Sequence, residues 1–102
     1  MSGAVPNLTP DQLQTVRAIL AAHMPAGFTA HVFGSRAEGT PKPWSDLDLV
    51  VEGPCPLPFA VTAALAEAFD ESDLPWKVDL VDRTCVSPTF GAIIDAGKIP
   101  LD

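Results

Sequence analysis

The sequence predicts a single α/β (α+β) domain in which a small mixed β-sheet is flanked by helices, and three observations lead to this class. Its 102 residues have room for one domain, spanning residues 1–102. A hydrophobic fraction of 47% with a charged fraction of 19% is typical of a folded chain. Helical and strand-like patterns alternate in the order helix, strand, turn, strand, helix, strand, helix, as expected for a mixed architecture.

The first helix is predicted from its capping residues. Thr9 suits the N-cap, Pro10 suits the first helical position, and Gln12 stands where a capping box needs a polar side chain. Side chains with apolar stems then recur at helical spacing, at Leu13, Val16, Arg17 and Leu20. Proline and glycine in the segment 25–27 end the helix.

Two strands follow, with a tight turn between them. Residues 28–33 alternate loosely between apolar and polar side chains, which predicts a short strand. Residues 34–43 break both periods, so we expect a turn there, with one helical turn beginning near Ser35. Residues 46–52 form the second predicted strand. The short connection favours antiparallel pairing of these two strands and a mixed sheet.

The second half of the chain predicts a helix, a strand and a last helix. The helix covers residues 58–69, and its core face is expected to contain Phe59, Thr62, Leu65, Ala66 and Phe69. Residues 76–81 form the third predicted strand. The last helix covers residues 88–96, with Ser87 as its N-cap and Gly97 as its C-terminal stop.

Two acidic residues in the second predicted strand are candidates for chemistry. Side chains alternate across a strand, so Asp46 and Asp48 share one face while Leu47 and Leu49 face the core. Two carboxylates side by side repel each other unless a cation lies between them. Carboxylate oxygens suit Mg²⁺, although an Asp-x-Asp pair is a weak signal when it stands alone.

The dipeptide Gly34-Ser35 directly follows the first predicted strand. Glycine allows a phosphate to approach the backbone closely or allows a positive φ. A helical turn that begins at Ser35 would direct free backbone N–H groups toward an anion. Taken alone, the dipeptide favours an ordinary turn that ends a strand, with the serine as a cap.

The spacing of these two features adds specificity. From Phe33 the chain reads Phe-Gly-Ser-Arg-Ala-Glu-Gly-Thr-Pro-Lys-Pro-Trp-Ser-Asp-Leu-Asp-Leu, with ten residues between Ser35 and Asp46. This pattern resembles the signature of the DNA-polymerase-β-like nucleotidyltransferase superfamily, in which Gly-Ser precedes Asp-x-Asp by ten residues. It is most similar to the minimal nucleotidyltransferases (MNT), which include the antitoxins of HEPN/MNT systems. The resemblance therefore implies a polymerase-β-like nucleotidyltransferase fold.

The resemblance also implies a two-metal site. Asp46 and Asp48 would hold two Mg²⁺ ions and act in catalysis, and a third acidic residue on a later strand usually completes such a site. Asp79 fits that place. Asp79 could instead cap the end of its strand at the surface, and Asp82, which is closer to the following loop, is a weaker candidate for the third ligand.

The substrate implied by the resemblance is ATP or another NTP. Gly34 and Ser35 would bind its β- and γ-phosphates. Arg36 has a guanidinium group suited to phosphate and could help to neutralise the triphosphate, or it could be an ordinary surface charge. Trp44 is expected to be a packing residue, with a minor role in nucleotide contact left open.

The function that the resemblance implies is Mg²⁺-dependent transfer of a nucleoside monophosphate, AMP from ATP, to a hydroxyl of a helical HEPN-like partner protein. The chain would then be the antitoxin of a toxin–antitoxin pair. Two alternatives remain open: a catalytic subunit that acts on a small molecule with a separate helical subunit, and a non-catalytic protein-binding module. Self-association into a homodimer is also open.

The composition argues against direct contact with nucleic acid or a membrane. Thirteen acidic residues outnumber six basic ones, for a formal net charge of −7, and no basic stripe is present. No apolar run is long enough to span a bilayer, and the N-terminus lacks the features of a signal peptide. Cys55 and Cys85 are isolated and are not spaced as zinc ligands. A cytoplasmic location is therefore expected.

Overall fold

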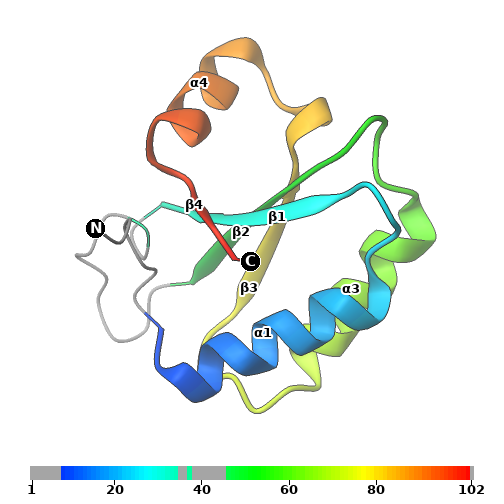
Figure 1. Ribbon diagram of the computed structural model, residues 1–102, viewed down its shortest axis with the longest axis vertical. Helices are drawn as coiled ribbons and strands as arrows, with labels where there is room; N and C mark the ends of the chain where they lie inside the picture. Colours follow the sequence, from blue (N-terminus) through cyan, green and yellow to red (C-terminus); the bar gives the residue numbers. More distant parts are fainter. Residues whose placement is uncertain (1–7, 35–36, 38–45, 102) are drawn as a thin grey trace.

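The computed structural model describes residues 8–34, 37 and 46–101, and Figure 1 shows how they are arranged. Its helices are α1 (Pro10–His23), α3 (Phe59–Asp70) and α4 (Pro88–Gly97), and a 3₁₀ turn covers Arg83–Cys85. Its strands are β1 (Thr29–Phe33), β2 (Leu47–Glu52), β3 (Val78–Asp82) and β4 (Ile99–Pro100). The element order predicted from the sequence is confirmed, and β4 is an addition to it.

The strands form one mixed sheet in the order β3-β2-β1-β4. Strand β1 pairs antiparallel with both β2 and β4, whereas β2 pairs parallel with β3. The parallel pair is joined through α3, because two parallel strands need a long crossover connection. The predicted antiparallel pairing of the first two strands and the mixed sheet are both confirmed.

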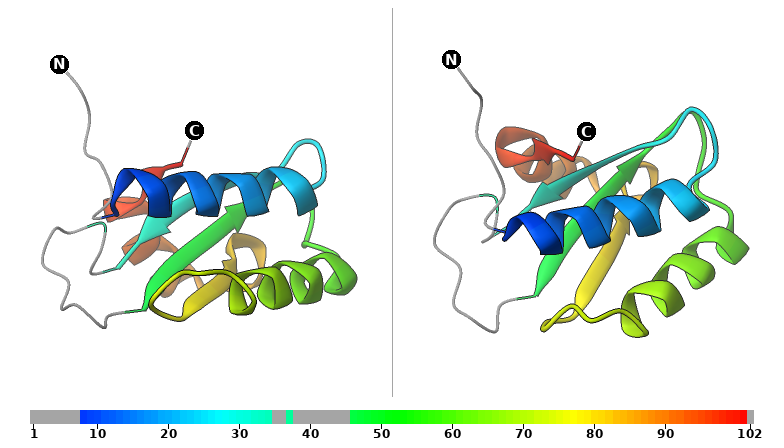
Figure 2. Two further views of the ribbon diagram at one scale, coloured as in Figure 1. Left: turned by 90° about the horizontal axis from the view of Figure 1, so that it is seen from below. Right: turned by 60° about the horizontal axis from the view of Figure 1, so that its bottom comes forward.

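Helices cover both faces of this sheet. Figure 2 shows α1 and α3 together on one face and α4 on the other. The larger core lies under α1 and α3 and includes Val16, Val32, Leu49, Leu65 and Phe69. The smaller core lies under α4 and consists of Phe33, Val50 and Ile94. The sheet is therefore a central layer, and alternate residues of each strand face different cores.

Local sequence signals explain where the helices begin. The Thr9 hydroxyl accepts a hydrogen bond from the Gln12 N–H at 3.1 Å, and the Gln12 side-chain oxygen accepts one from the Thr9 N–H at 3.0 Å. This reciprocal pair is the predicted capping box. Likewise, the Ser87 hydroxyl accepts a hydrogen bond from the Phe90 N–H at 3.2 Å and caps α4.

Three expectations about individual residues are wrong. Ala66 is exposed rather than on the core face of α3. Phe59 is 87% exposed rather than in the core, because Leu57, just before α3, fills the core at this end of the helix. Gly97 is the last residue of α4 rather than its stop, and Lys98 is the C-cap. The chain after Lys98 then adds β4 to the free side of β1, where Val32 pairs with Ile99.

Candidate functional site

The candidate site lies at one end of the sheet, where three strands place side chains in a row on the α4 face. The antiparallel register puts Asp48 opposite Phe33, and the parallel register puts Asp48 opposite Asp79. Asp48 shares its face with Val50, two residues along β2, which packs under α4. The row therefore reads Asp79, Asp48, Phe33 across β3, β2 and β1.

Gly34 forms a tight turn directly above this row. Its φ is +78°, in the left-handed region that favours glycine. A Cβ atom at this position would stand 2.5 Å from the Asp48 Oδ2 atom, so any larger residue would require the carboxylate to move. The Gly34 carbonyl accepts a hydrogen bond from the Ala37 N–H at 3.1 Å, which closes a short turn after β1. The turn and the carboxylate are thus in direct contact.

Electrostatics at the row favour a cation. Burial raises the pKa of the Asp48 carboxyl above its ordinary value, and the negative charges of Asp79 and Asp46 raise it further. Among the residues that the structure describes, no Lys, Arg or His forms a salt bridge with any of these three carboxylates. Crowded negative charge that no described Lys, Arg or His offsets is a setting in which a divalent cation is favoured.

The donor set fits Mg²⁺ in chemistry, although the carboxylates are not gathered into a closed cage. Within the described residues, no group of three or more His, Cys, Asp or Glu side chains is close enough to form a metal site by itself. An open arrangement is compatible with Mg²⁺, which usually keeps several waters and binds one or two carboxylates together with substrate phosphates.

The predicted site residues fall into two groups. The structure brings together Gly34, Asp48 and Asp79, while Asp46 is exposed immediately before β2. Asp79 lies within β3 rather than capping its end. Ser35, Arg36 and Trp44 lie outside the described residues, so their roles, like the metal and catalytic roles of the aspartates, stay predictions.

Asp82 is not part of this row, and its carboxylate makes structural hydrogen bonds instead. One of its carboxylate oxygens accepts a hydrogen bond from the Leu57 N–H at 2.6 Å. The other accepts hydrogen bonds from the N–H and the hydroxyl of Thr84, at 2.9 and 2.7 Å. Because Asp82 pairs in register with Val51, it lies at the opposite end of β3 from Asp79. It joins the strand to the loops that flank it.

An aromatic pair beside the row was missed by sequence reasoning. The rings of Phe33 and Phe90 meet edge to face, with centroids 6.0 Å apart and planes at 76°. Phe33 could have been singled out because it directly precedes Gly34 in the sequence. No sequence signal distinguished Phe90, since its contact with Phe33 depends on how α4 packs on the sheet.

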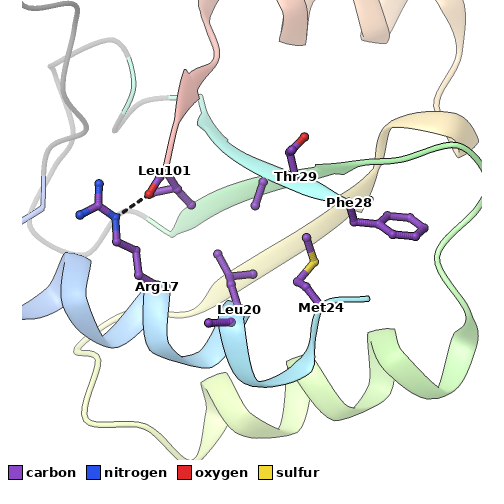
Figure 3. Close-up of a pocket in the computed structure, with 8 residues that line it drawn as sticks. Arg17, Leu20, Met24, Phe28, Thr29 and Leu101 are labelled. Atoms are coloured by element: carbon purple, nitrogen blue, oxygen red, sulfur yellow. Dashed lines mark hydrogen bonds between the residues drawn. The ribbon is translucent and has the colours of Figure 1, made fainter. Parts of the chain in front are cut away.

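A cavity of about 410 Å³ lies elsewhere, between α1 and β1 (Figure 3). Apolar side chains line most of it, including Leu20, Met24 and Phe28, and the Arg17 Nε–H donates a hydrogen bond to the Leu101 carbonyl at its edge. None of the row carboxylates lines this cavity, so it is separate from the candidate site. Across the described ranges, every helix falls short of the length and apolar character that a membrane crossing demands.

Comparisons with known proteins identify the family of this chain. A family model described as a nucleotidyltransferase domain matches residues 13–98. A probable protein adenylyltransferase MntA from Haemophilus influenzae is 43% identical over 88 residues, which cover 86% of this chain and 76% of that protein.

Solved structures give the same result. A crystal structure of a toxin–antitoxin with AMP-PNP matches with a TM-score of 0.74 and 26% identity, covering 88% of this chain and 72% of that one. A spectinomycin adenyltransferase from Enterococcus faecialis, solved with ATP and spectinomycin, matches with a TM-score of 0.56 and 27% identity. That match covers 79% of this chain and 37% of the other. This chain belongs to the nucleotidyltransferase domain family and is a nucleotidyltransferase of the MntA type.

Proposed function

We propose that this domain transfers AMP from Mg²⁺-bound ATP to a hydroxyl of a helical, HEPN-like partner protein, as the antitoxin of a toxin–antitoxin pair. One observation carries the proposal: the Gly34 turn lies directly against Asp48, which lies beside Asp79. A phosphate-binding turn and a pair of carboxylates in contact are what the transfer of a nucleotide needs, because the phosphates and their counter-ions must meet there.

Asp46, Asp48 and Asp79 are the residues that would hold Mg²⁺. When bound, the ions would lower the proton affinity of the acceptor hydroxyl and stabilise the pyrophosphate that leaves. The raised pKa of Asp48 supports this assignment, because it reflects negative charge that a bound cation would offset.

The remaining work of the chain is to position the substrate. The glycine at position 34 allows phosphate oxygens to approach the backbone beside Asp48, and Ser35 and Arg36 are proposed to bind the same phosphates. The acceptor hydroxyl would release its proton to water as its oxygen forms a bond to the α-phosphorus and the bond from that phosphorus to pyrophosphate breaks. In-line placement of the acceptor supplies much of the rate, so whatever carries the hydroxyl must dock against this end of the sheet.

Three comparisons bear on the choice of acceptor. The MntA relative is named as a probable protein adenylyltransferase. The solved structure with a TM-score of 0.74 is a toxin–antitoxin with AMP-PNP, an ATP analogue. Both support a protein acceptor and ATP as the donor. The spectinomycin enzyme supports a second candidate function, in which the domain modifies a small molecule bound by a separate subunit.

Labelled ATP separates these functions. The chain is co-expressed with the product of the neighbouring gene and incubated with Mg²⁺ and ATP labelled at the α-phosphate. We expect label on the partner protein, and none with Asp48→Asn or Asp79→Asn. Glu67→Gln is the matched control, because Glu67 is an exposed carboxylate on α3, which covers the opposite face of the sheet. Label that appears only on an added small acceptor would favour the second function, and no label on any acceptor would favour a protein-binding module.

The cellular location that we propose is the cytoplasm. Cys55 and Cys85 are both exposed and unpaired, as is usual in a reducing compartment. The proposed donor, ATP, is a metabolite of the cytoplasm.

A further inference from the structure

Phe90 is an exposed aromatic residue at the edge of the candidate site. It lies in the first turn of α4 and is 39% exposed, whereas Phe33, the ring that it meets edge to face, is only 8% exposed. Phe33 therefore supports Phe90 from below, and the free part of the Phe90 ring remains available for contact. Edge-to-face pairs are a favoured arrangement of two aromatic rings, so this support also fixes the ring's orientation.

This aromatic surface is next to the proposed phosphate site along both the chain and the sheet. Phe33 directly precedes Gly34 and is paired in register with Asp48. The side chains of Asp79, Asp48 and Phe33 lie on the α4 side of the sheet. Across this end of the sheet the order is therefore carboxylate, carboxylate, aromatic ring. Phe90 therefore packs against the residue that directly precedes the proposed phosphate-binding glycine.

The helix that carries Phe90 is held firmly in place. Ile94 packs into the core with Phe33 and Val50. Arg83 donates two hydrogen bonds to Asp95, at 3.2 and 2.8 Å, and fixes the last turn of α4 to the 3₁₀ turn that follows β3. The C-terminal end is fixed by a salt bridge from Lys98 to a carboxylate at the end of β2. Phe90 is therefore positioned before any ligand arrives, which lowers the entropy cost of using it.

We propose that Phe90, supported by Phe33, packs against the nucleoside of the bound NTP and supplies affinity for its base. This inference rests on the proposed function, because it takes the phosphates to lie at Gly34. The base is the apolar, planar part of the substrate, and stacking on an aromatic side chain tolerates any base because every base has a π-face. Phe90 therefore contributes affinity without selecting ATP over GTP.

Binding of two probes to the purified chain tests this inference. Isothermal titration calorimetry with Mg-ATP measures contacts to the phosphates and the nucleoside, whereas Mg-tripolyphosphate measures contacts to the phosphates alone. We expect Phe90→Ala to weaken binding of Mg-ATP by about 5- to 150-fold, the range found when a stacked aromatic residue is removed. The affinity for Mg-tripolyphosphate should not change in Phe90→Ala. Phe90→Trp, which keeps an aromatic ring, should bind Mg-ATP as the unmodified chain does.

Ile93→Ala is the matched control, because Ile93 is an apolar side chain on the same helix that is 65% exposed. It should leave both affinities unchanged.

Three results would overturn the inference. If Phe90→Ala bound Mg-ATP as the unmodified chain does, the ring would have no role in binding the nucleoside. A loss of partner binding in this variant would not change that conclusion. If the variant lost affinity for both probes equally, the ring would act by supporting the fold. If the unmodified chain bound neither probe, the proposed function would fail and this inference with it, an outcome distinct from the other two.

Discussion

Replacing Gly34 by alanine tests the contact between the turn and Asp48. The substitution has two separable effects. The first is backbone strain, because φ at this position is +78°, where a residue with a Cβ atom is disfavoured by about 1–2 kcal/mol. The second is a collision, because the new Cβ would stand 2.5 Å from the Asp48 Oδ2 atom. That oxygen is the end of a side chain that can rotate, so we expect the carboxylate to move away.

Gly27→Ala isolates the first effect. Its φ is +88°, similar to that of Gly34, but the nearest neighbouring atom to a new Cβ is the Pro54 Cδ atom at 3.9 Å, an ordinary contact. Both variants should therefore lose similar stability. For a domain of this size the strain corresponds to a fall in Tm of about 4–16 °C, at about 4–8 °C per kcal/mol. Only Gly34→Ala should also displace a site carboxylate.

Thermal unfolding and calorimetric titration with Mg-ATP measure the two effects independently. We expect similar melting temperatures for the two variants, normal binding for Gly27→Ala and strongly weakened binding for Gly34→Ala. If Gly34→Ala bound Mg-ATP as well as Gly27→Ala does, the close approach to Asp48 would have no role in the site. If it unfolded far more readily than Gly27→Ala, the carboxylate would be held too firmly to move, and our reasoning about its rotation would be refuted.

Three further predictions concern stability. Burial and two acidic neighbours raise the pKa of Asp48, so ionisation of this side chain destabilises the folded protein as pH rises. Asp48→Asn should therefore raise Tm at pH 7. The gain should vanish below the ordinary pKa of Asp, where the Asp48 carboxyl is already protonated. Burial alone would raise the pKa of Asp82, but hydrogen bonds from Thr84 and Leu57 outweigh burial and lower this pKa. Asp82→Asn should therefore lower Tm at pH 7. The difference in Tm should disappear as pH falls through the lowered pKa. Thr9→Ala removes the helix cap and should lower the free energy of unfolding by about 0.5–2 kcal/mol in denaturant titrations, whereas equal midpoints would show that the cap contributes nothing.

Features that depend on neighbouring residues could be predicted from the sequence. The start of α1 follows from Thr9 and Gln12, and the start of α4 follows from Ser87, because a cap is built within one helical turn. The alternation that turns Asp48 away from the α1 and α3 core also follows from the sequence, since side chains on a strand alternate. These local rules explain why the element order and the mixed sheet were predicted correctly.

Features that depend on contacts between distant segments could not be predicted. The parallel register that sets Asp79 beside Asp48 is fixed by the length and packing of α3, which no local pattern reveals. Strand β4 is too short for a periodic signal, since it pairs only two of its residues with β1. The helical spacing of Phe59 relative to Leu65 and Phe69 predicts a core position, but the structure places Leu57 in the core and leaves Phe59 exposed.

The antiparallel register of β1 and β2 also bears on how such a domain can evolve. Pairing of Phe33 with Asp48 holds Gly34 against the carboxylate through backbone hydrogen bonds between the strands. The pairing of the two strands therefore sets the distance between these two groups. Connections between strands tolerate substitution and insertion better than the strands that they join. Mutations in that connection, outside the proposed phosphate-binding residues Ser35 and Arg36, can therefore alter what a descendant of this protein recognises while the carboxylates and the glycine keep their positions.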